Sequence, residues 1–218
     1  VDNEVARLRI LKAAHEGKRF ALQDAVTFQY PKRIQSLEKE LQSLQMDLDR
    51  RNQAMEVQPG FAITLQGKVY EKHKEAGEVL RGIIEGVTAF TRHEVGMYKG
   101  FQVFVQKDMM EPVLFLQGEK EYSVELKSSD SGNMVRMENR LNALDKAVED
   151  VQKEIKTCEN EIKNAKQEYA KPFPYEELLK ENITRQMEID AELEIKDQEE
   201  CVEVQEETKN LPCQTAVR

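Results

Sequence analysis

The chain has 218 residues, of which 33% are charged and only 6% are aromatic, and it contains no Trp. This composition is too lean for a thick globular core and is typical of long helices with narrow apolar stripes. The net charge is −9, and residues 171–218 hold 6 Lys or Arg against 13 Asp or Glu. The rest of the chain is close to neutral, so the strongly basic surface typical of nucleic-acid-binding proteins is absent.

Targeting signals and cysteine content indicate the cellular compartment of a protein. There is no basic-then-apolar signal peptide and no apolar run of about 18 residues, so the sequence predicts neither export nor a membrane-spanning helix. The three cysteines form no CxxC pair and are odd in number, which favours reduced thiols in a cytoplasmic protein. The first residue is Val rather than Met, and we interpret the chain as a piece of a longer protein.

The first part of the chain is predicted to be helical. Residues 3–30 form one predicted helix, and Pro31 starts or kinks the next one, over about 32–56. Within it the stretch IQSLEKELQSLQMDL, residues 34–48, places apolar side chains at alternating spacings of three and four. This is the pattern of a coiled-coil seam, so we expect a second helix to cover it.

Residues 60–127, called the head below, have a different pattern and predict a small α+β domain. Apolar and polar residues alternate around the turn dipeptide Gln66-Gly67, which indicates a β-hairpin. The predicted elements, in chain order, are that hairpin at 61–71, a helix at 73–90 and strands at 100–107, 111–117 and 121–127. The order ββαβββ predicts an antiparallel sheet with one helix on a face.

Three glycines recur along the predicted helix of the head. Gly77, Gly82 and Gly86 each cost helix stability, by about 1 kcal/mol relative to Ala. We therefore expect them to serve a close approach between the helix backbone and the sheet. We also expect the head to have a core of its own, separate from the helices on either side.

A matching seam follows the head. Residues 133–170 repeat the spacing of three and four over five heptads. Antiparallel pairing with the helix over 32–56 places Leu48 opposite Leu141 and Ile34 opposite Ile155. Pro172 and Pro174 then interrupt the helix, and a further helix is predicted over 175–195. Leu179, Ile183 and Met187 of that helix are expected to reach Leu11, Leu8 and Val5.

The predicted fold class is therefore α+β, a long antiparallel helical hairpin or coiled-coil arm with an inserted ββαβββ domain at its tip. The predicted domains are a first arm at 1–59, the head at 60–127, a second arm at 128–195 and an acidic, poorly ordered tail at 196–218.

A search for catalytic motifs finds none. The sequence lacks a GxxxxGK[ST] loop, a GxGxxG after a strand, HExxH and GxSxG. His15 lies at a seam-like position, where a tolerated polar residue is the more common interpretation than a ligand. We therefore predict that the chain itself is not an enzyme and takes no cofactor, metal or small-molecule substrate.

One cluster of basic residues in the head is a candidate for a nucleic-acid or partner surface. Basic groups with an aromatic among them can hold phosphate and stack a base, although Glu71, Glu75 and Glu94 dilute the charge here. The candidate residues are Lys68, Tyr70, Lys72, His73 and Lys74 around the second strand and the helix start, with Arg92 and Lys99 in the predicted loop after the helix.

Several ordered blocks resemble a known group of proteins. They are NEVARLRILKAAHE, FAITLQGKVYEKHKEAGEVL, GMYKGFQVFV, YSVELKSSDSGNMVRMENRL and KPFPYEELL. Together they resemble the C-terminal region of very large bacterial proteins of conjugative elements and phages, which join a superfamily-two helicase core to an adenine-specific DNA methylase-like domain. The resemblance covers roughly residues 3–195 and implies a DNA-processing parent. It brings no catalytic residue, because neither helicase nor methylase motifs occur in this chain.

Two functions are consistent with these observations. The first is an accessory module of a DNA-processing enzyme, whose head contacts DNA weakly and without sequence preference, or contacts a neighbouring domain of the same polypeptide. The second is a protein-interaction or spacer module that never touches nucleic acid. The resemblance favours the first, and the near-neutral head slightly favours the second.

Overall fold

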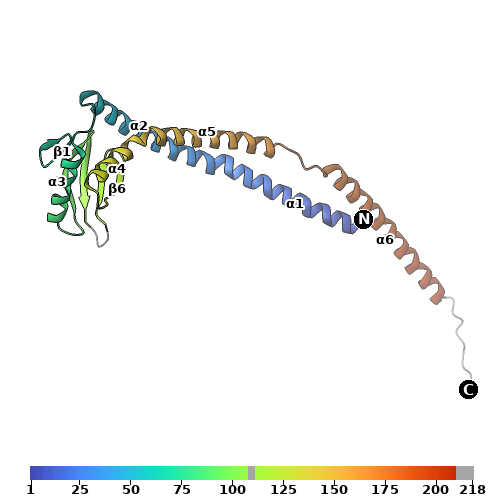
Figure 1. Ribbon diagram of the computed structural model, residues 1–218. Helices are drawn as coiled ribbons and strands as arrows, with labels where there is room; N and C mark the ends of the chain where they lie inside the picture. Colours follow the sequence, from blue (N-terminus) through green and yellow to red (C-terminus); the bar gives the residue numbers. More distant parts are fainter. Residues whose placement is uncertain (108–110, 210–218) are drawn as a thin grey trace, which may run out of the picture. The chain divides into compact units, whose positions relative to one another are not determined.

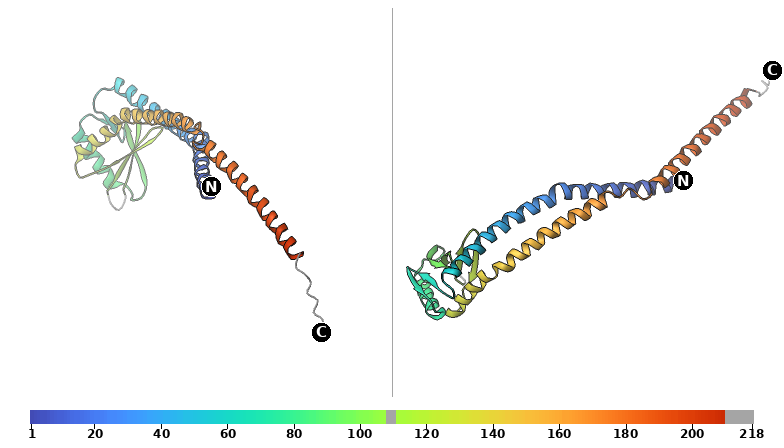
Figure 2. Two further views of the ribbon diagram at one scale, coloured as in Figure 1. Left: turned by 90° about the vertical axis from the view of Figure 1, so that its right-hand side faces the viewer. Right: turned by 90° about the horizontal axis from the view of Figure 1, so that it is seen from above.

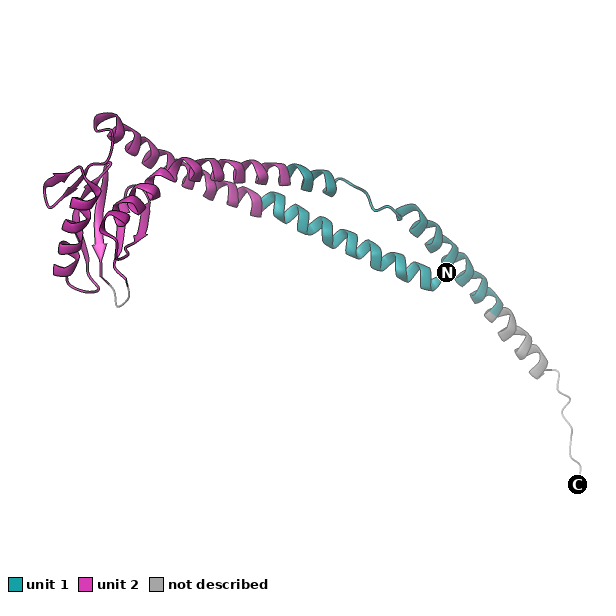
Figure 3. Ribbon diagram, viewed as in Figure 1, with its two compact units in different colours: residues 1–27, 162–218 teal, residues 28–161 magenta. Residues whose placement is uncertain are grey.

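The computed structural model describes residues 1–107 and 111–209, with side chains described up to residue 196. The protein is α+β, with a long N-terminal helix, a six-stranded antiparallel sheet and further helices (Figure 1). It forms two compact units (Figure 3). Unit 1 comprises residues 1–27 and the described part of 162–218, and unit 2 comprises residues 28–161. The predicted arm, head and tail ranges stay a prediction.

Unit 1 is built on α1 (Asp2–Asp24), the end of α5 (Leu144–Tyr169) and α6 (Glu176–Lys209). Lys12 donates to Glu176 at 2.9 Å and Gln186 donates to Asp2 at 2.9 Å, so α1 and α6 run antiparallel. Their buried contact consists of Val5, Leu8 and Leu179, with Phe173 and Ile183 packed against it.

Two expectations for α6 differ from the structure. Met187 is 66% exposed and lies outside the cluster that it was predicted to join. The helix also continues through Lys209, past the predicted start of the tail at residue 196. The last part of that predicted tail, residues 210–218, lies outside the described residues.

Pro31 marks a change of helix type. The α-helical hydrogen bonding of α1 gives way to a π-helix, η1, at Ala25–Gln29, and α2 (Tyr30–Val57) starts with Pro31 in its first turn. Because Pro has no N–H, it cannot donate to the carbonyl four residues before it, and a π turn is one way to absorb the missing bond. Pro31 thus starts a helix, one of the two predicted outcomes.

The sheet of unit 2 has one strand more than predicted. Its strand order is β2-β1-β3-β4-β5-β6, and every neighbouring pair is antiparallel. The strands are β1 Ile63–Leu65, β2 Lys68–Tyr70, β3 Arg92–Tyr98, β4 Phe101–Gln106, β5 Val113–Gln117 and β6 Glu121–Glu125. The order is therefore ββαββββ, and the prediction ββαβββ is wrong because it treated Arg92–Tyr98 as a loop.

The missed strand, β3, lies at the centre of the sheet between β1 and β4. Its pairing register shifts between Glu94 and Gly96, so Val95 is the extra residue of a β-bulge. The bulge breaks the alternation of apolar and polar residues by which a strand is recognised. Gly96 permits close pairing there, because a Cβ at this position would lie 1.8 Å from the carbonyl oxygen of Thr64 on β1.

Two helices of unit 2, α3 (His73–Gly86) and α4 (Asp130–Asn142), lie side by side (Figure 1; Figure 2). A Cβ on Gly77 would lie 2.4 Å from the backbone oxygen of Asp130, whereas Gly82 and Gly86 face open space. The expected close approach to the sheet is therefore wrong for all three glycines. Gly77 instead serves contact between the two helices.

A single apolar cluster holds unit 2 together. It joins buried strand residues such as Val103 and Leu116 with Leu44 of α2, Leu144 of α5 and Met137 of α4. The predicted helix over 133–170 is divided at Ala143, where α4 ends and α5 follows. The expectation of a head core separate from the flanking helices does not hold, because both flanking helices contribute to the same cluster.

Candidate functional site

The candidate residues at the start of α3 are held by acidic neighbours. Lys72 donates to Glu75 at 2.8 Å, and this hydrogen bond and charge raise the pKa of Lys72. The ring of His73 stacks on Phe61 with a centroid distance of 3.9 Å, and its Nε2 lies 3.1 Å from Glu138. Both side chains thus already contact a carboxylate.

Lys99 is engaged with backbone oxygens. It occupies the β3–β4 turn with a φ of 48°, and its Nζ donates to the carbonyls of Gln58 and Gly60 at 2.7 and 2.5 Å. Burial lowers its pKa. Lys99 therefore holds the loop after α2 against the sheet, which is a structural role.

Two of the candidate lysines, Lys68 and Lys74, form no ion pair with the described side chains. The Nζ of Lys68 lies 5.3 Å from the centroid of the Tyr70 ring, a cation–π contact, and no carboxylate among the described side chains pairs with it. Lys74 is exposed on the first turn of α3 and has no ion pair within the described part of the chain. Of the predicted basic surface, Lys68, Tyr70 and Lys74 therefore remain.

Arg92 lies on the opposite side of the sheet from Lys68 and Tyr70. Its guanidinium lies over the rings of Phe104 and Phe115, 4.7 and 4.4 Å from their centroids, and donates to Glu121 at 2.6 Å. Phe104 and Phe115 are directly paired across β4 and β5, and paired residues point to the same side of a sheet. Their neighbours along the strands, such as Val105, are fully buried on the other side, which α3 and α4 cover.

We call the side with the two phenylalanines the open face. Its residues are Thr64, Val69, Arg92, Glu94, Met97, Gln102, Phe104, Gln106, Val113, Phe115, Gln117, Glu121, Ser123 and Glu125. Val69 and Met97 are 51% and 49% exposed. The face thus combines apolar side chains with amides, and it carries one Arg against three Glu.

A hollow of about 440 Å³ adjoins the open face. Thr64 and Met97 form one wall, and Val57 and Arg50 at the end of α2 form the other. Lys99 lines it as well, with its ammonium group directed to backbone oxygens. The hollow extends the open face beyond β1 toward the end of α2.

Asp47 of α2 anchors the β5–β6 turn. Its side chain is fully buried and accepts hydrogen bonds from the backbone N–H groups of Glu119 and Lys120, at 2.7 and 2.9 Å, and from the Tyr122 hydroxyl at 2.8 Å. Burial, and then the bond to Asp47, raise the pKa of Tyr122. Sequence reasoning missed this residue, because an Asp on a charged helix is usually solvated.

Arg51 is the second buried polar anchor. It donates to the carbonyl oxygen of Leu141 at 3.0 Å and to both carboxylate oxygens of Asp145, at 2.7 and 3.2 Å. The hydrogen bond from Arg51 is the main cause that lowers the pKa of Asp145. A fork of this kind ties α2 to the junction of α4 and α5.

Comparisons with protein families, with curated proteins and with solved structures find no match to this chain. Among the described residues, no group of three or more His, Cys, Asp or Glu is placed to hold a metal ion. None of the described helices is both long and apolar enough to cross a membrane.

Proposed function

We propose that this chain is a non-catalytic accessory module of a larger DNA-processing protein, and that its head docks through the open face on a neighbouring domain of that polypeptide. The observation that carries the proposal is the pair Phe104 and Phe115, placed side by side in the middle of the sheet face opposite α3 and α4, with Arg92 above them. Aromatic residues with an Arg among them are enriched at the centres of protein interfaces.

Charge favours a protein partner over nucleic acid on this face. The single cation, Arg92, is paired with Glu121, and Glu94 and Glu125 add further negative charge. Phosphate backbones are bound by clusters of unpaired Lys and Arg. A partner surface that is apolar at its centre and weakly basic around it fits the open face better.

We further propose that α2 and α5 form an antiparallel coiled-coil arm that carries the head. Two ion pairs support this arrangement. Arg51 near the end of α2 pairs with Asp145 at the start of α5, and Arg33 near the start of α2 pairs with Glu154 further along α5. The order of partners is reversed between the helices, as an antiparallel pairing requires, and Leu41, Leu48 and Val151 pack against the common core.

Docking is tested by adding the flanking segments of the parent polypeptide in trans and measuring affinity by calorimetry. A double variant, Phe104→Ser with Phe115→Ser, is expected to weaken binding at least about tenfold, as loss of central aromatic residues does. The matched control is Phe20→Ser with Phe28→Ser, because these two phenylalanines are 75% and 67% exposed outside the open face. Equal affinities for the two double variants would refute docking through the open face.

DNA contact is the second candidate function. It is favoured by Lys68, which lies over the Tyr70 ring, and by the exposed Lys74, neither of which has an ion pair among the described residues. The test titrates single- and double-stranded DNA at low salt against the wild type and a Lys68→Glu, Lys72→Glu, Lys74→Glu variant. With only a few phosphate contacts, we expect weak binding that falls with salt at a log–log slope of roughly −2 to −3. Equal binding by both proteins, or none by either, removes this surface as a DNA site.

A further inference from the structure

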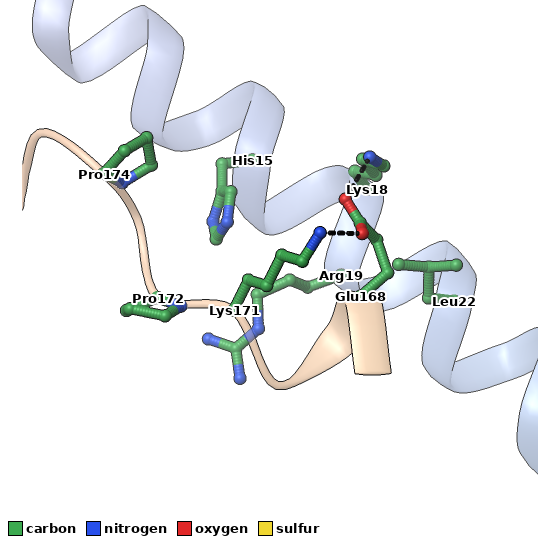
Figure 4. A pocket seen from close by; sticks show the side chains of 8 residues that line it. All are labelled: His15, Lys18, Arg19, Leu22, Glu168, Lys171, Pro172 and Pro174. Atoms are coloured by element: carbon green, nitrogen blue, oxygen red, sulfur yellow. Dashed lines mark hydrogen bonds and ion pairs between the residues drawn. The ribbon is translucent and has the colours of Figure 1, made fainter. Parts of the chain in front are cut away.

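A cavity of about 260 Å³ lies in unit 1, where the connection between α5 and α6 passes α1 (Figure 4). Pro172 and Pro174 prevent helical hydrogen bonding there, so α5 ends at Tyr169 and α6 begins only at Glu176. A continuous helix would place side chains against α1 along this stretch. The irregular connection leaves a space instead.

Four residues of α1 line the cavity from one side. His15, Lys18, Arg19 and Leu22 follow the spacing i, i+3, i+4, i+7, which places them on one face of the helix. From the other side come Glu168 and Lys171, and Figure 4 shows the ring of His15 pointing from α1 toward the side chains of Arg19 and Lys171. Basic groups therefore reach the same space from two segments.

The cavity has an excess of positive charge. Lys18 and Lys171 share one carboxylate, that of Glu168, at 3.1 and 2.6 Å. Hydrogen bonds from Lys171 and Lys18 lower the pKa of Glu168, so this group is ionised at neutral pH. Three cations with Arg19 against one carboxylate leave a formal charge of +2 among the lining residues.

Arg19 has unused hydrogen-bonding capacity. Its guanidinium lies 4.6 Å from the centroid of the Tyr169 ring, which holds the group in place. Its Nε is buried and has no acceptor among the described residues, and no carboxylate pairs with the side chain there. Buried N–H groups in proteins nearly always have a partner, so this N–H can donate to an acceptor that enters the cavity.

We propose that this cavity binds the phosphate group of a small molecule. The guanidinium of Arg19 offers parallel N–H donors that match phosphate oxygens, and Lys18 and Lys171, which meet at Glu168, add positive charge to the lining. Leu22, Pro172 and Pro174 supply apolar walls for a compact group attached to the phosphate. The volume is below the roughly 300–1,000 Å³ of sites for drug-sized ligands, which favours a small phosphate ester. This site is independent of docking through the open face.

The test uses the whole chain and three probes at constant ionic strength: inorganic phosphate, phenyl phosphate and a short oligothymidylate. Binding is followed by NMR through the Nε–Hε signal of Arg19, which reports contact at the group itself. Phenyl phosphate is expected to shift this signal saturably, with a Kd on the order of 1 mM, and to bind more tightly than inorganic phosphate. Preference for the oligonucleotide would instead assign the site to a phosphodiester chain and overturn the small-molecule proposal.

Variants show whether Arg19 is responsible; because Arg19→Gln and Arg19→Lys lack the Nε–Hε group, their affinities and those of the wild type are compared through the backbone amide shifts of residues that line the cavity. Arg19→Gln should weaken phenyl phosphate binding at least about tenfold, and Arg19→Lys should recover only part of it, because Lys keeps the charge but loses the fork. The control is Arg7→Gln on the same helix, whose side chain is 70% exposed and paired with Glu4; its affinity should stay at the wild-type value. Helix content of each variant is checked by circular dichroism, and if Arg19→Gln loses helix, the wild-type titration and Arg19→Lys decide. No saturable shift in the wild type, or equal affinity with Arg19→Gln or Arg19→Lys, would overturn the proposal.

Discussion

The two compact units are stabilised in different ways. In the described part of unit 2, 20 buried apolar residues from the sheet and four helices form one continuous core. In the described part of unit 1, the buried apolar cluster has three members, Val5, Leu8 and Leu179, and ion pairs such as Lys12–Glu176 lie along the same contact. Because stability follows buried apolar area, we expect unit 1 to open locally at a lower free energy than unit 2.

The largest effect is expected from a charge placed in the core of unit 2. Leu144 is 2% exposed and belongs to the common cluster, so Leu144→Asp buries a carboxylate without a partner and costs several kcal/mol. Because the cluster is shared, the sheet should lose its fold together with α5. Hydrogen exchange of amides in β4 and β5, combined with urea denaturation, measures this outcome.

The control for this prediction is Val135→Asp on α4, at a position that is 44% exposed. It should change the free energy of unfolding by no more than about 0.5 kcal/mol. If the β4 and β5 amides of Leu144→Asp stayed protected while α5 exchanged, the sheet would have a core of its own, as the sequence alone suggested.

The equivalent change in unit 1 should have a smaller and local effect. Leu179 is 4% exposed, and its neighbour on α6, Leu178, is 42% exposed. Leu179→Asp should remove protection from the amides of α1 and α6 near the cluster and leave the exchange of unit 2 unchanged, because the two clusters have no member in common. Leu178→Asp should leave both unchanged. Loss of protection in β4 or β5 on Leu179→Asp would show that the units unfold as one.

Within unit 2, two glycines of α3 test how closely α3 packs against α4. Gly77→Ala must displace the backbone of Asp130, which would lie 2.4 Å from the new Cβ, so we expect a loss of about 1–3 kcal/mol, as for overpacking. Gly82→Ala faces open space and should stabilise the protein by about 0.5–1 kcal/mol through helix propensity. Thermal unfolding measures both, and a shift of the same sign for the two would contradict the close contact of α3 with α4.

Much of the fold follows from periodicity in the sequence. The turn at Gln66-Gly67 and the helix after it were predicted, because turn dipeptides and helical spacing are local signals. Strand β3 was not predicted, because its bulge at Val95 removes the alternation and its first residues are polar. The role of Gly77 depends on Asp130, which is distant in the sequence, and no local pattern reveals such a pair.

The candidate site was less accessible to prediction than the fold. Arg92 was grouped with Lys68 because both precede or follow the same helix, and only the pairing of β3 with β4 shows that its side chain belongs to the open face. The aromatic pair Phe104 and Phe115 is adjacent only through the register of β4 with β5. When both sides of a strand carry apolar residues, the sequence does not show which side is covered by helices.

The smallest effect is expected where unit 2 relies on a partly solvated ion pair. The pKa of Asp145 is lowered from its ordinary value of 3.8 by the hydrogen bond from Arg51. A carboxyl whose pKa is lower in the folded state adds stability that is fully present above the unfolded-state pKa and is lost as the pH falls through the folded-state value. Asp145→Asn should therefore lower the free energy of unfolding at neutral pH. The loss should stay below about 1 kcal/mol, because the Asp145 side chain is 59% exposed and the pair is screened by water.

The pH dependence separates this ion pair from simple loss of packing. Urea denaturation of the wild type and of Asp145→Asn should differ by a constant amount above about pH 5, and the difference should shrink as the pH falls below 3.8. Glu149→Gln, one turn further along α5 at an exposed position without an ion pair in the described chain, should match the wild type at neutral pH. A difference between Asp145→Asn and wild type that persists unchanged at low pH would mean that Asp145 acts through its shape, and that Arg51 is held by the Leu141 carbonyl and the Asn52 side chain.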